Sequence, residues 1–377
     1  MGVLRVSFPA AVVALALPGL AIAQAPPDAW PQFRGNPALT GVAGAALPDP
    51  LEVVWSVQAG EAVESSVAIA EGRVYAATSD GDLVALALDS GAELWRTRVT
   101  EDGIGESSPA VSGDLVFVGD LGGALHAVGR DDGSPAWSHV TDGEIKSSPV
   151  VVGELVLVGS YDGFLYALKT SGGELAWKAE SQGPVHCTAA VAGGLAYIAG
   201  CDEYFRGIRL SDGAQVVEVS SGAYTGASPA IAADVAYYGT FDSEVLSLAL
   251  GDAGRVAWRY EPGDRRFPFY ASAAVADGKV VVGGRDKRVH ALDAATGEAL
   301  WVFETRSRVE SSPAVAGDRV YVGSNDGRLY VLELASGALV QEFNAGAPLS
   351  ASPAVASGRL VIGSLDGELF CLGRRAE

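Results

Sequence analysis

Carboxylates recur at one place along the chain, and a ring of such groups could bind a metal ion. They stand in or beside short turns, with Gly122 in the place of one member: Asp80, Asp162, Asp202, Asp242, Asp286, Asp326 and Asp366. The same carboxylate in the same turn of seven units is explained more simply by an Asx turn, in which the side chain accepts a nearby backbone N–H. We therefore expect these residues to be structural and to hold no metal.

Serine pairs followed by proline also recur, and an activated serine could be a nucleophile. A nucleophile needs a base and an orienting group at the same site, but these serines repeat in most units without any partner pattern. None of the four histidines has a metal-ligand spacing, and His126 and His290 stand where other units have Tyr166, Tyr330 or Phe370. The sequence therefore offers no candidate catalytic residue.

Polar residues that break the repeat are the better candidates for binding. Two residues before each second serine lies a variable set, named here the rim ring: Glu64, Glu106, Lys146, His186, Gly226, Tyr270, Glu310 and Ser350. The single long insertion, residues 259–270 (RYEPGDRRFPFY), is expected at the same end of the fold. Its Arg and aromatic residues, of types favoured at binding hot spots, are Arg265, Arg266, Phe267, Phe269 and Tyr270. The alternative is an ordinary variable loop.

The elements that must position these residues are repeated strands. The second serine of each pair, named here the anchor, has eight equivalents: Ser66, Ser108, Ser148, Thr188, Ser228, Ser272, Ser312 and Ser352. A period of 40 to 44 residues with several short strands predicts the blades of a β-propeller and no helix. We predict an all-β, eight-bladed propeller of four-stranded antiparallel blades.

Residues 51–57 resemble a fourth strand, and the last unit lacks one after residue 373. The N-terminal strand is therefore expected to complete the last blade and close the ring. We divide the chain into a signal peptide (1–23), a lead-in strap (24–50), the propeller (51–373) and a tail (374–377). Deleting residues 24–31 is expected to cost far less stability than deleting residues 51–57.

Tryptophans mark one place on the fourth strand, where an indole can cover the backbone of the next blade. They are Trp55, Trp95, Trp137, Trp177, Trp258 and Trp301. A fixed frame precedes them, for example ALDAATGEALW at residues 291–301. This frame resembles the tryptophan-docking motif of pyrroloquinoline-quinone-like (PQQ-like) propeller repeats. In size and blade count the chain is also similar to the propeller subunit of the outer-membrane β-barrel assembly machine, but no lipoprotein Cys follows the predicted signal peptide.

The resemblance leaves three classes of function to consider. Quinoprotein dehydrogenases of this family bind PQQ and calcium, using adjacent Cys residues and Glu and Asn ligands, but this chain has no adjacent Cys pair and only three Asn. We expect instead a non-catalytic protein-interaction scaffold or ligand-binding platform in the cell envelope, without a cofactor. A small-molecule or carbohydrate binder at the channel mouth is the third alternative.

The three cysteines are Cys187, Cys201 and Cys371. Cys371 stands in a small-residue place of the third strand and is expected to be a buried free thiol. An oxidising compartment favours a Cys187–Cys201 disulfide, whereas strand register places Cys201 one residue off, on the opposite face. The sequence leaves both outcomes open.

Residues 1–23 combine Arg5, an apolar run and a small-residue cleavage site before Gln24, the layout of a cleavable signal. We expect a periplasmic or secreted monomer without a membrane span. A formal net charge of −20 excludes nucleic acid as a partner class, because nucleic-acid binding needs clustered Lys or Arg. A protein or a small ligand is the expected partner.

Overall fold

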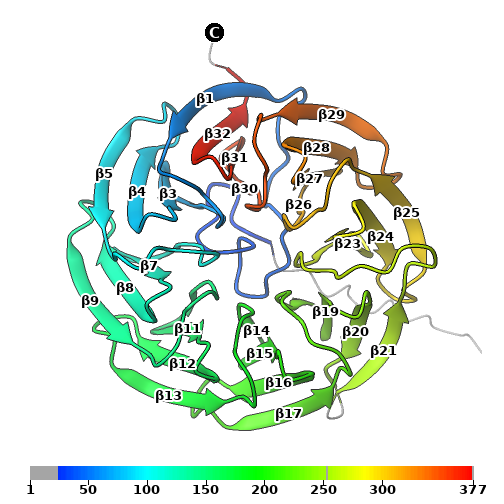
Figure 1. Ribbon diagram of the computed structural model, residues 1–377, viewed down its shortest axis with the longest axis horizontal. Helices are drawn as coiled ribbons and strands as arrows, with labels where there is room; N and C mark the ends of the chain where they lie inside the picture. Colours follow the sequence, from blue (N-terminus) through cyan, green and yellow to red (C-terminus); the bar gives the residue numbers. More distant parts are fainter. Residues whose placement is uncertain (1–23, 252–253, 376–377) are drawn as a thin grey trace, which may run out of the picture.

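The structure is a computed structural model that describes residues 24–251 and 254–375; the predicted signal peptide lies outside this part. Within it, all regular structure is β, in eight antiparallel sheets of four strands arranged around a central channel (Figure 1). The predicted fold class is confirmed. In the described part of the chain no helix is long and apolar enough to span a bilayer.

Each blade runs outward from a short inner strand to a longer outer one. Blades 1 to 4 are β2 (Ala68–Ala70), β3 (Arg73–Ala77), β4 (Asp82–Ala87) and β5 (Glu93–Arg98); β6 (Ala110–Ser112), β7 (Leu115–Gly119), β8 (Ala124–Gly129) and β9 (Pro135–Val140); β10 (Val150–Val152), β11 (Leu155–Gly159), β12 (Phe164–Lys169) and β13 (Leu175–Glu180); and β14 (Ala190–Ala192), β15 (Leu195–Ala199), β16 (Tyr204–Arg209) and β17 (Gln215–Ser220). Blades 5 to 7 are β18 (Ala230–Ala232), β19 (Val235–Gly239), β20 (Val245–Ala249) and β21 (Arg255–Tyr260); β22 (Ala274–Ala276), β23 (Lys279–Gly284), β24 (Arg288–Asp293) and β25 (Ala299–Glu304); and β26 (Ala314–Ala316), β27 (Arg319–Gly323), β28 (Arg328–Glu333) and β29 (Leu339–Asn344).

Blade 8 is built from both ends of the chain. It contains β30 (Ala354–Ala356), β31 (Arg359–Gly363) and β32 (Glu368–Gly373), and β1 (Glu52–Gln58) pairs antiparallel with β32 as the outer strand. This pairing leaves no open edge between the first and last blades, as the repeat pattern predicts.

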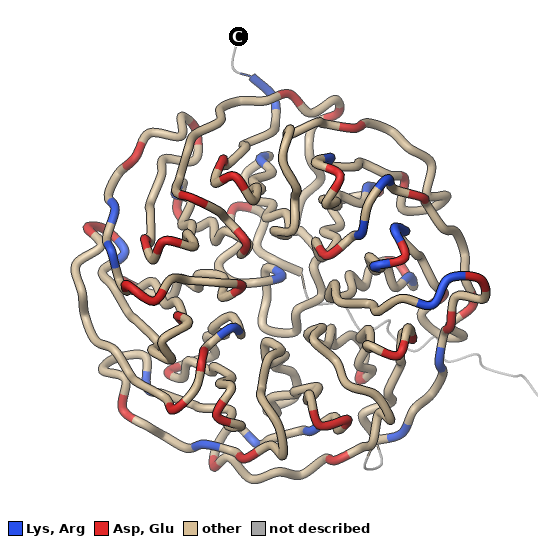
Figure 2. The backbone as a smooth tube through the Cα atoms, in the orientation of Figure 1, with Lys and Arg blue, Asp and Glu red and all other residues tan. Residues whose placement is uncertain are grey.

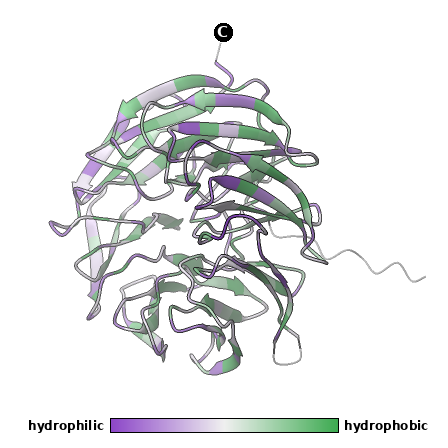
Figure 3. Cartoon of the chain, turned by 45° about the vertical axis from the view of Figure 1, so that its right-hand side comes forward, coloured by the Kyte–Doolittle hydropathy of each residue, from purple (hydrophilic) through white to green (hydrophobic). Residues whose placement is uncertain are grey.

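The inner and middle strands are mainly hydrophobic, whereas the outer strands mix hydrophilic and hydrophobic residues, as Figure 3 shows by colour. The middle strands are almost entirely buried, whereas the outer strands alternate between exposed and buried residues. A bulge in the outer strand, at Trp95 in blade 1, leaves Leu94 unpaired and turns the indole inward. Seven other blades use the same strand order, so the core is a series of layers between neighbouring sheets.

Indole N–H groups join six of the eight blades to the next blade. Trp301 Nε1 donates to Leu334 O at 3.0 Å, and the other five indoles make equivalent bonds of 2.7 to 3.1 Å. The ring lies against a turn glycine: a Cβ on Gly337, whose φ is +71°, would be 2.6 Å from Trp301. Glycine is therefore required there both for space and for its left-handed backbone.

The anchor hydroxyls join the blades on the inside. Ser108 Oγ accepts the backbone N–H of Ser66, and each further anchor accepts the N–H of the preceding one, at 2.9 to 3.0 Å. Seven such bonds link the eight blades, which explains why every anchor is Ser or Thr. The anchors are therefore structural, as the sequence indicates.

The strap lies inside the ring, in the centre of Figure 1. From Pro27 to Ala43 it follows the channel wall and bonds in turn to the inner strands of blades 8, 1, 2, 3, 4, 5, 6 and 7. Its one basic residue, Arg34, is buried and donates to Ser312 O and Ala273 O, both at 3.1 Å. Trp30 is fully buried and pairs with Ile69 through both backbone groups. The strap is thus part of the core, and deleting residues 24–31 would remove the buried Trp30, which the expectation of a far smaller cost than for residues 51–57 did not foresee.

The cysteines do not form the disulfide that the compartment favours. All three thiols are free, and Cys187 and Cys371 are buried. Cys187 Sγ accepts the N–H of Ala199 at 3.3 Å, while the Cys201 thiol donates to Thr225 O at 3.4 Å. The two side chains thus face different partners. The register of β14 with β15, continued beyond Ala190 and Tyr197, would place residue 187 opposite residue 200 and not 201.

Candidate functional site

The rim ring surrounds one cavity of about 360 Å³ at a mouth of the channel. All eight rim-ring residues line it, and the anchors stand below them. Phe33 of the strap closes it from the channel side, because the strap bonds each inner strand a few residues beyond the anchor. Repeat geometry brings the rim ring together, since its members occupy one position in eight blades.

The insertion does not share this site. Arg265, Arg266 and Phe267 do not line the cavity, and the connection from β21 to β22 that carries them begins at the outer edge of the ring before it runs inward (Figure 2). Phe267 is 50% exposed, but Phe269 is 1% exposed and packs against His290, so Phe269 is wrong as a binding-face residue. Tyr270 alone reaches the mouth.

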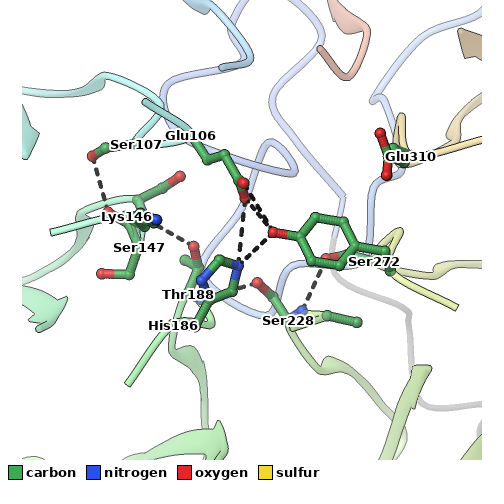
Figure 4. A network of polar contacts seen from close by, with 12 residues as sticks. Glu106, Ser107, Lys146, Ser147, His186, Thr188, Ser228, Ser272 and Glu310 are labelled. Carbon is green, nitrogen blue, oxygen red and sulfur yellow. Dashed lines mark hydrogen bonds and ion pairs between the residues drawn. The ribbon is translucent and has the colours of Figure 1, made fainter. Parts of the chain in front are cut away.

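A chain of hydrogen bonds crosses one side of the mouth, where Figure 4 shows Glu106, Lys146 and His186 together. The Tyr161 hydroxyl lies 2.6 Å from His186 Nδ1, and His186 Nε2 lies 2.8 Å from the Tyr270 hydroxyl. That hydroxyl donates to both carboxylate oxygens of Glu106, at 2.8 and 2.9 Å. These contacts join Tyr161, His186, Tyr270 and Glu106 in one continuous polar network.

This network sets the protonation of its members. Burial opposes ionisation of Glu106, but hydrogen bonds from His186 and Tyr270 outweigh it, so the pKa of Glu106 is lowered. The pKa of Tyr270 is raised, by burial first and then by the charge of Glu106. The carboxylate is therefore held charged beside a neutral phenol. Tyr161, His186, Tyr270 and Glu106 are thus bonded to one another on this side of the mouth.

The opposite side is closed by ion pairs around Glu310, which Figure 4 shows away from the other labelled rim residues. Arg285 contacts one carboxylate oxygen at 2.8 Å, Arg308 the other at 3.3 Å, and Asn325 donates to the latter oxygen at 3.1 Å. Arg285 also lies over the Tyr270 ring, 4.8 Å from its centroid. Glu310 is thus neutralised by two guanidinium groups.

Sequence reasoning missed a second variable position. Tyr161, Arg285, Asn325 and Leu365 immediately precede the repeated Asp of the second turn, and three of the four bond to the rim ring. The signal was present, because this position varies from blade to blade whereas the Asp beside it is kept in seven of the eight units. The Asp side chains themselves are turned into their own loops; Asp162 Oδ1, for example, accepts the N–H of Phe164 at 3.0 Å.

The cavity residues do not fit PQQ with calcium. In residues 24–251 and 254–375, no group of three or more His, Cys, Asp or Glu could hold a metal ion. PQQ is an anionic quinone whose carboxylates need free cations, but Arg285 and Arg308 are paired with Glu310, and Lys146 lies 3.2 Å from Glu144. No reaction step is therefore assigned to this cofactor.

Comparison with known proteins agrees with this architecture. A family model described as "Outer membrane protein assembly factor BamB" matches residues 48–147, 79–240, 143–266 and 242–376. The chain belongs to this family. A stretch of 94 residues is 34% identical to BamB of Marinobacter adhaerens, covering 24% of this BamB-family chain and 23% of that relative. The aligned stretch thus spans less than a quarter of the relative's length.

Two solved structures show how widely the fold is shared. BamB from Moraxella catarrhalis superposes with a TM-score of 0.73 at 19% identity, over 87% of this chain and 98% of that one. Quinohemoprotein alcohol dehydrogenase from Comamonas testosteroni superposes with a TM-score of 0.77 at 14% identity, over 93% and 82%. At these identities the likeness shows the fold alone, so function must be argued from the site.

Proposed function

We propose that this BamB-family chain is a non-catalytic binding platform in the cell envelope, and that the cavity mouth framed by the rim ring is its working surface. A partner protein in the assembly of outer membrane proteins is the occupant that family membership favours. The chain itself supplies a cavity lined mainly by polar side chains, held by a closed ring of blades.

The observation that carries this proposal is the distribution of variable residues. Packing fixes the anchors, the docking indoles and the turn Asp residues, yet the rim ring varies in charge and size from blade to blade. Its members face one cavity and are not scattered over the surface. Groups that the fold does not need, concentrated at one opening, are best explained by contact with a partner.

Site-specific photocrosslinking tests the proposal. A photoreactive phenylalanine analogue replaces Leu365 at the mouth or, as a control, Glu154 in the β10–β11 hairpin at the other end of the ring. We expect a discrete adduct from the Leu365 position, identified by mass spectrometry as an envelope assembly protein. Equal labelling from both positions, or none from Leu365, would contradict the proposal.

A small polar ligand is the second candidate, because a cavity of about 360 Å³ falls within the size range of small-molecule sites. Native mass spectrometry of protein from its own envelope separates the two candidates. A retained mass that disappears on denaturation favours the ligand. The dehydrogenase alternative is tested by dye reduction after incubation with PQQ and calcium, and any turnover would refute a non-catalytic role.

A further inference from the structure

The hydrogen bonding of the cavity wall is incomplete on one side only. Around the anchors, the bonds run from blade to blade and stop at the junction of blades 8 and 1, named here the seam. Ser66 Oγ, which would accept the N–H of the preceding anchor, has no partner among the described residues, and the same is true of Ser65 Oγ and Ser350 Oγ. All three residues line the cavity, and Ser65 and Ser66 are almost fully buried.

A carboxylate stands beside these hydroxyls. Glu64 directly precedes Ser65 and lines the same cavity. It makes no hydrogen bond or ion pair to any described residue, unlike Glu106 and Glu310. Burial and the neighbouring charge of Glu106 raise its pKa, and Lys146 offsets this only in part. Glu64 is therefore an exposed acceptor on the cavity wall that no described residue pairs.

Buried polar atoms without partners are costly, and in native proteins a ligand or water usually supplies the missing bonds. The buried unpaired atoms at the seam are three hydroxyl oxygens, and the exposed carboxylate of Glu64 stands beside them. Together these four groups suit a cation with several N–H donors. An anionic ligand would face Glu64 with no cation free to offset it. Leu365 and Phe33 also line the cavity and offer apolar surface to a methylene stem.

We propose that the seam side of the cavity binds the primary ammonium group of a lysine side chain presented by a partner protein. The ammonium donates to the Glu64 carboxylate and to the hydroxyls of Ser66 and Ser350, while its stem lies on Leu365. This inference rests on the proposed function, because it names the chemical group of the partner protein that binds in the cavity.

Ligand-observed NMR with Nα-acetyl-lysine methylamide tests the site on the intact mature protein. We expect saturable binding that Nα-acetyl-norleucine methylamide, which has the stem but no charge, does not show. Glu64→Gln should weaken binding about tenfold, because a charge-assisted hydrogen bond is lost. Glu154→Gln removes the same charge at the opposite end of the ring and should leave affinity unchanged.

Three results would overturn the inference: no binding of the lysine probe, equal binding of the norleucine analogue, or equal effects of Glu64→Gln and Glu154→Gln. Ser350→Ala is a second variant, expected to weaken binding about threefold without changing charge. Crosslinking from position 365 keeps this test separate from the proposed function. If the position-365 adduct forms but the lysine probe does not bind the protein with native Glu64, the lysine site alone is refuted. If no adduct forms from position 365 in that same protein, the platform is refuted.

Discussion

Trp30→Ala is the sharpest perturbation of the strap. The indole is fully buried, and truncating a buried aromatic to Ala typically costs about 3–5 kcal/mol. Its Nε1 donor has no partner in the described structure, so removing it relieves a penalty of about 1 kcal/mol. The expected net loss of unfolding free energy is about 2–4 kcal/mol. The backbone pairing with Ile69 is untouched by the substitution.

Trp177→Ala is the matched control, because it removes the same atoms from a docking position. That indole is nearly buried and donates to Leu210 O at 2.7 Å, so its loss should cost about 3–5 kcal/mol. Both variants are measured by urea unfolding followed by far-ultraviolet circular dichroism, with equal m values required before midpoints are compared.

The two variants together decide whether the strap belongs to the cooperative core. If Trp30→Ala loses less than about 1 kcal/mol while Trp177→Ala loses several, the strap is only loosely coupled to the blades and the reasoning fails. A variant that binds the lysine probe normally but unfolds earlier would show that the strap supports the ring without shaping the seam.

Three further predictions concern the closure of the ring by β1, the three cysteine thiols and the carboxylate of Glu64. Deleting residues 51–57 removes β1 and should abolish cooperative unfolding or cause aggregation, whereas a stable monomer would contradict the closed ring. Thiol titration should count three reactive thiols after denaturation. In the folded protein only half-buried Cys201 should react, and slowly, because burial raises the pKa of Cys187 and Cys371 to about 12. A count of one thiol after denaturation would show that Cys187 and Cys201 form a disulfide. The pKa of Glu64, measured from its carboxyl 13C chemical shift, should lie above the ordinary value for Glu and should fall in the Glu106→Gln variant. Because a raised pKa in the folded state means that ionisation of Glu64 opposes folding, stability is lost as the pH rises through that pKa. Glu64→Gln should therefore be at least as stable as wild type at neutral pH.

The fold was predictable from the sequence because the same residue pattern recurs in successive blades. Anchors, turn glycines and indoles recur at fixed spacing, and each makes the same contact in successive blades. The rim ring was predictable for the same reason, since a shared register position becomes a shared place in the ring. Closure by residues 51–57 needed only the missing fourth strand of the last unit.

What the sequence could not supply were contacts of segments outside the repeat. The strap has no strand periodicity, so nothing in it indicates that Trp30 and Arg34 lie inside the channel. Phe269 was misplaced because an insertion looks uniformly exposed, although its last residues return to the core. The unpaired hydroxyls at the seam depend on distances between blades 8 and 1, which no single repeat encodes.

The order of contacts along the strap bears on how such a chain can evolve. Repeat arrays commonly gain and lose units by in-frame duplication or deletion, because each unit contacts only its neighbours. Here a single non-repeated segment touches the inner strands of all the blades in one circuit, ending at blade 7 beside its starting point at blade 8. A duplicated blade would therefore meet no strap residue, and a deleted one would leave strap residues without an edge. Because the contacts of the strap match eight blades, a change in blade number would disrupt them and should be selected against.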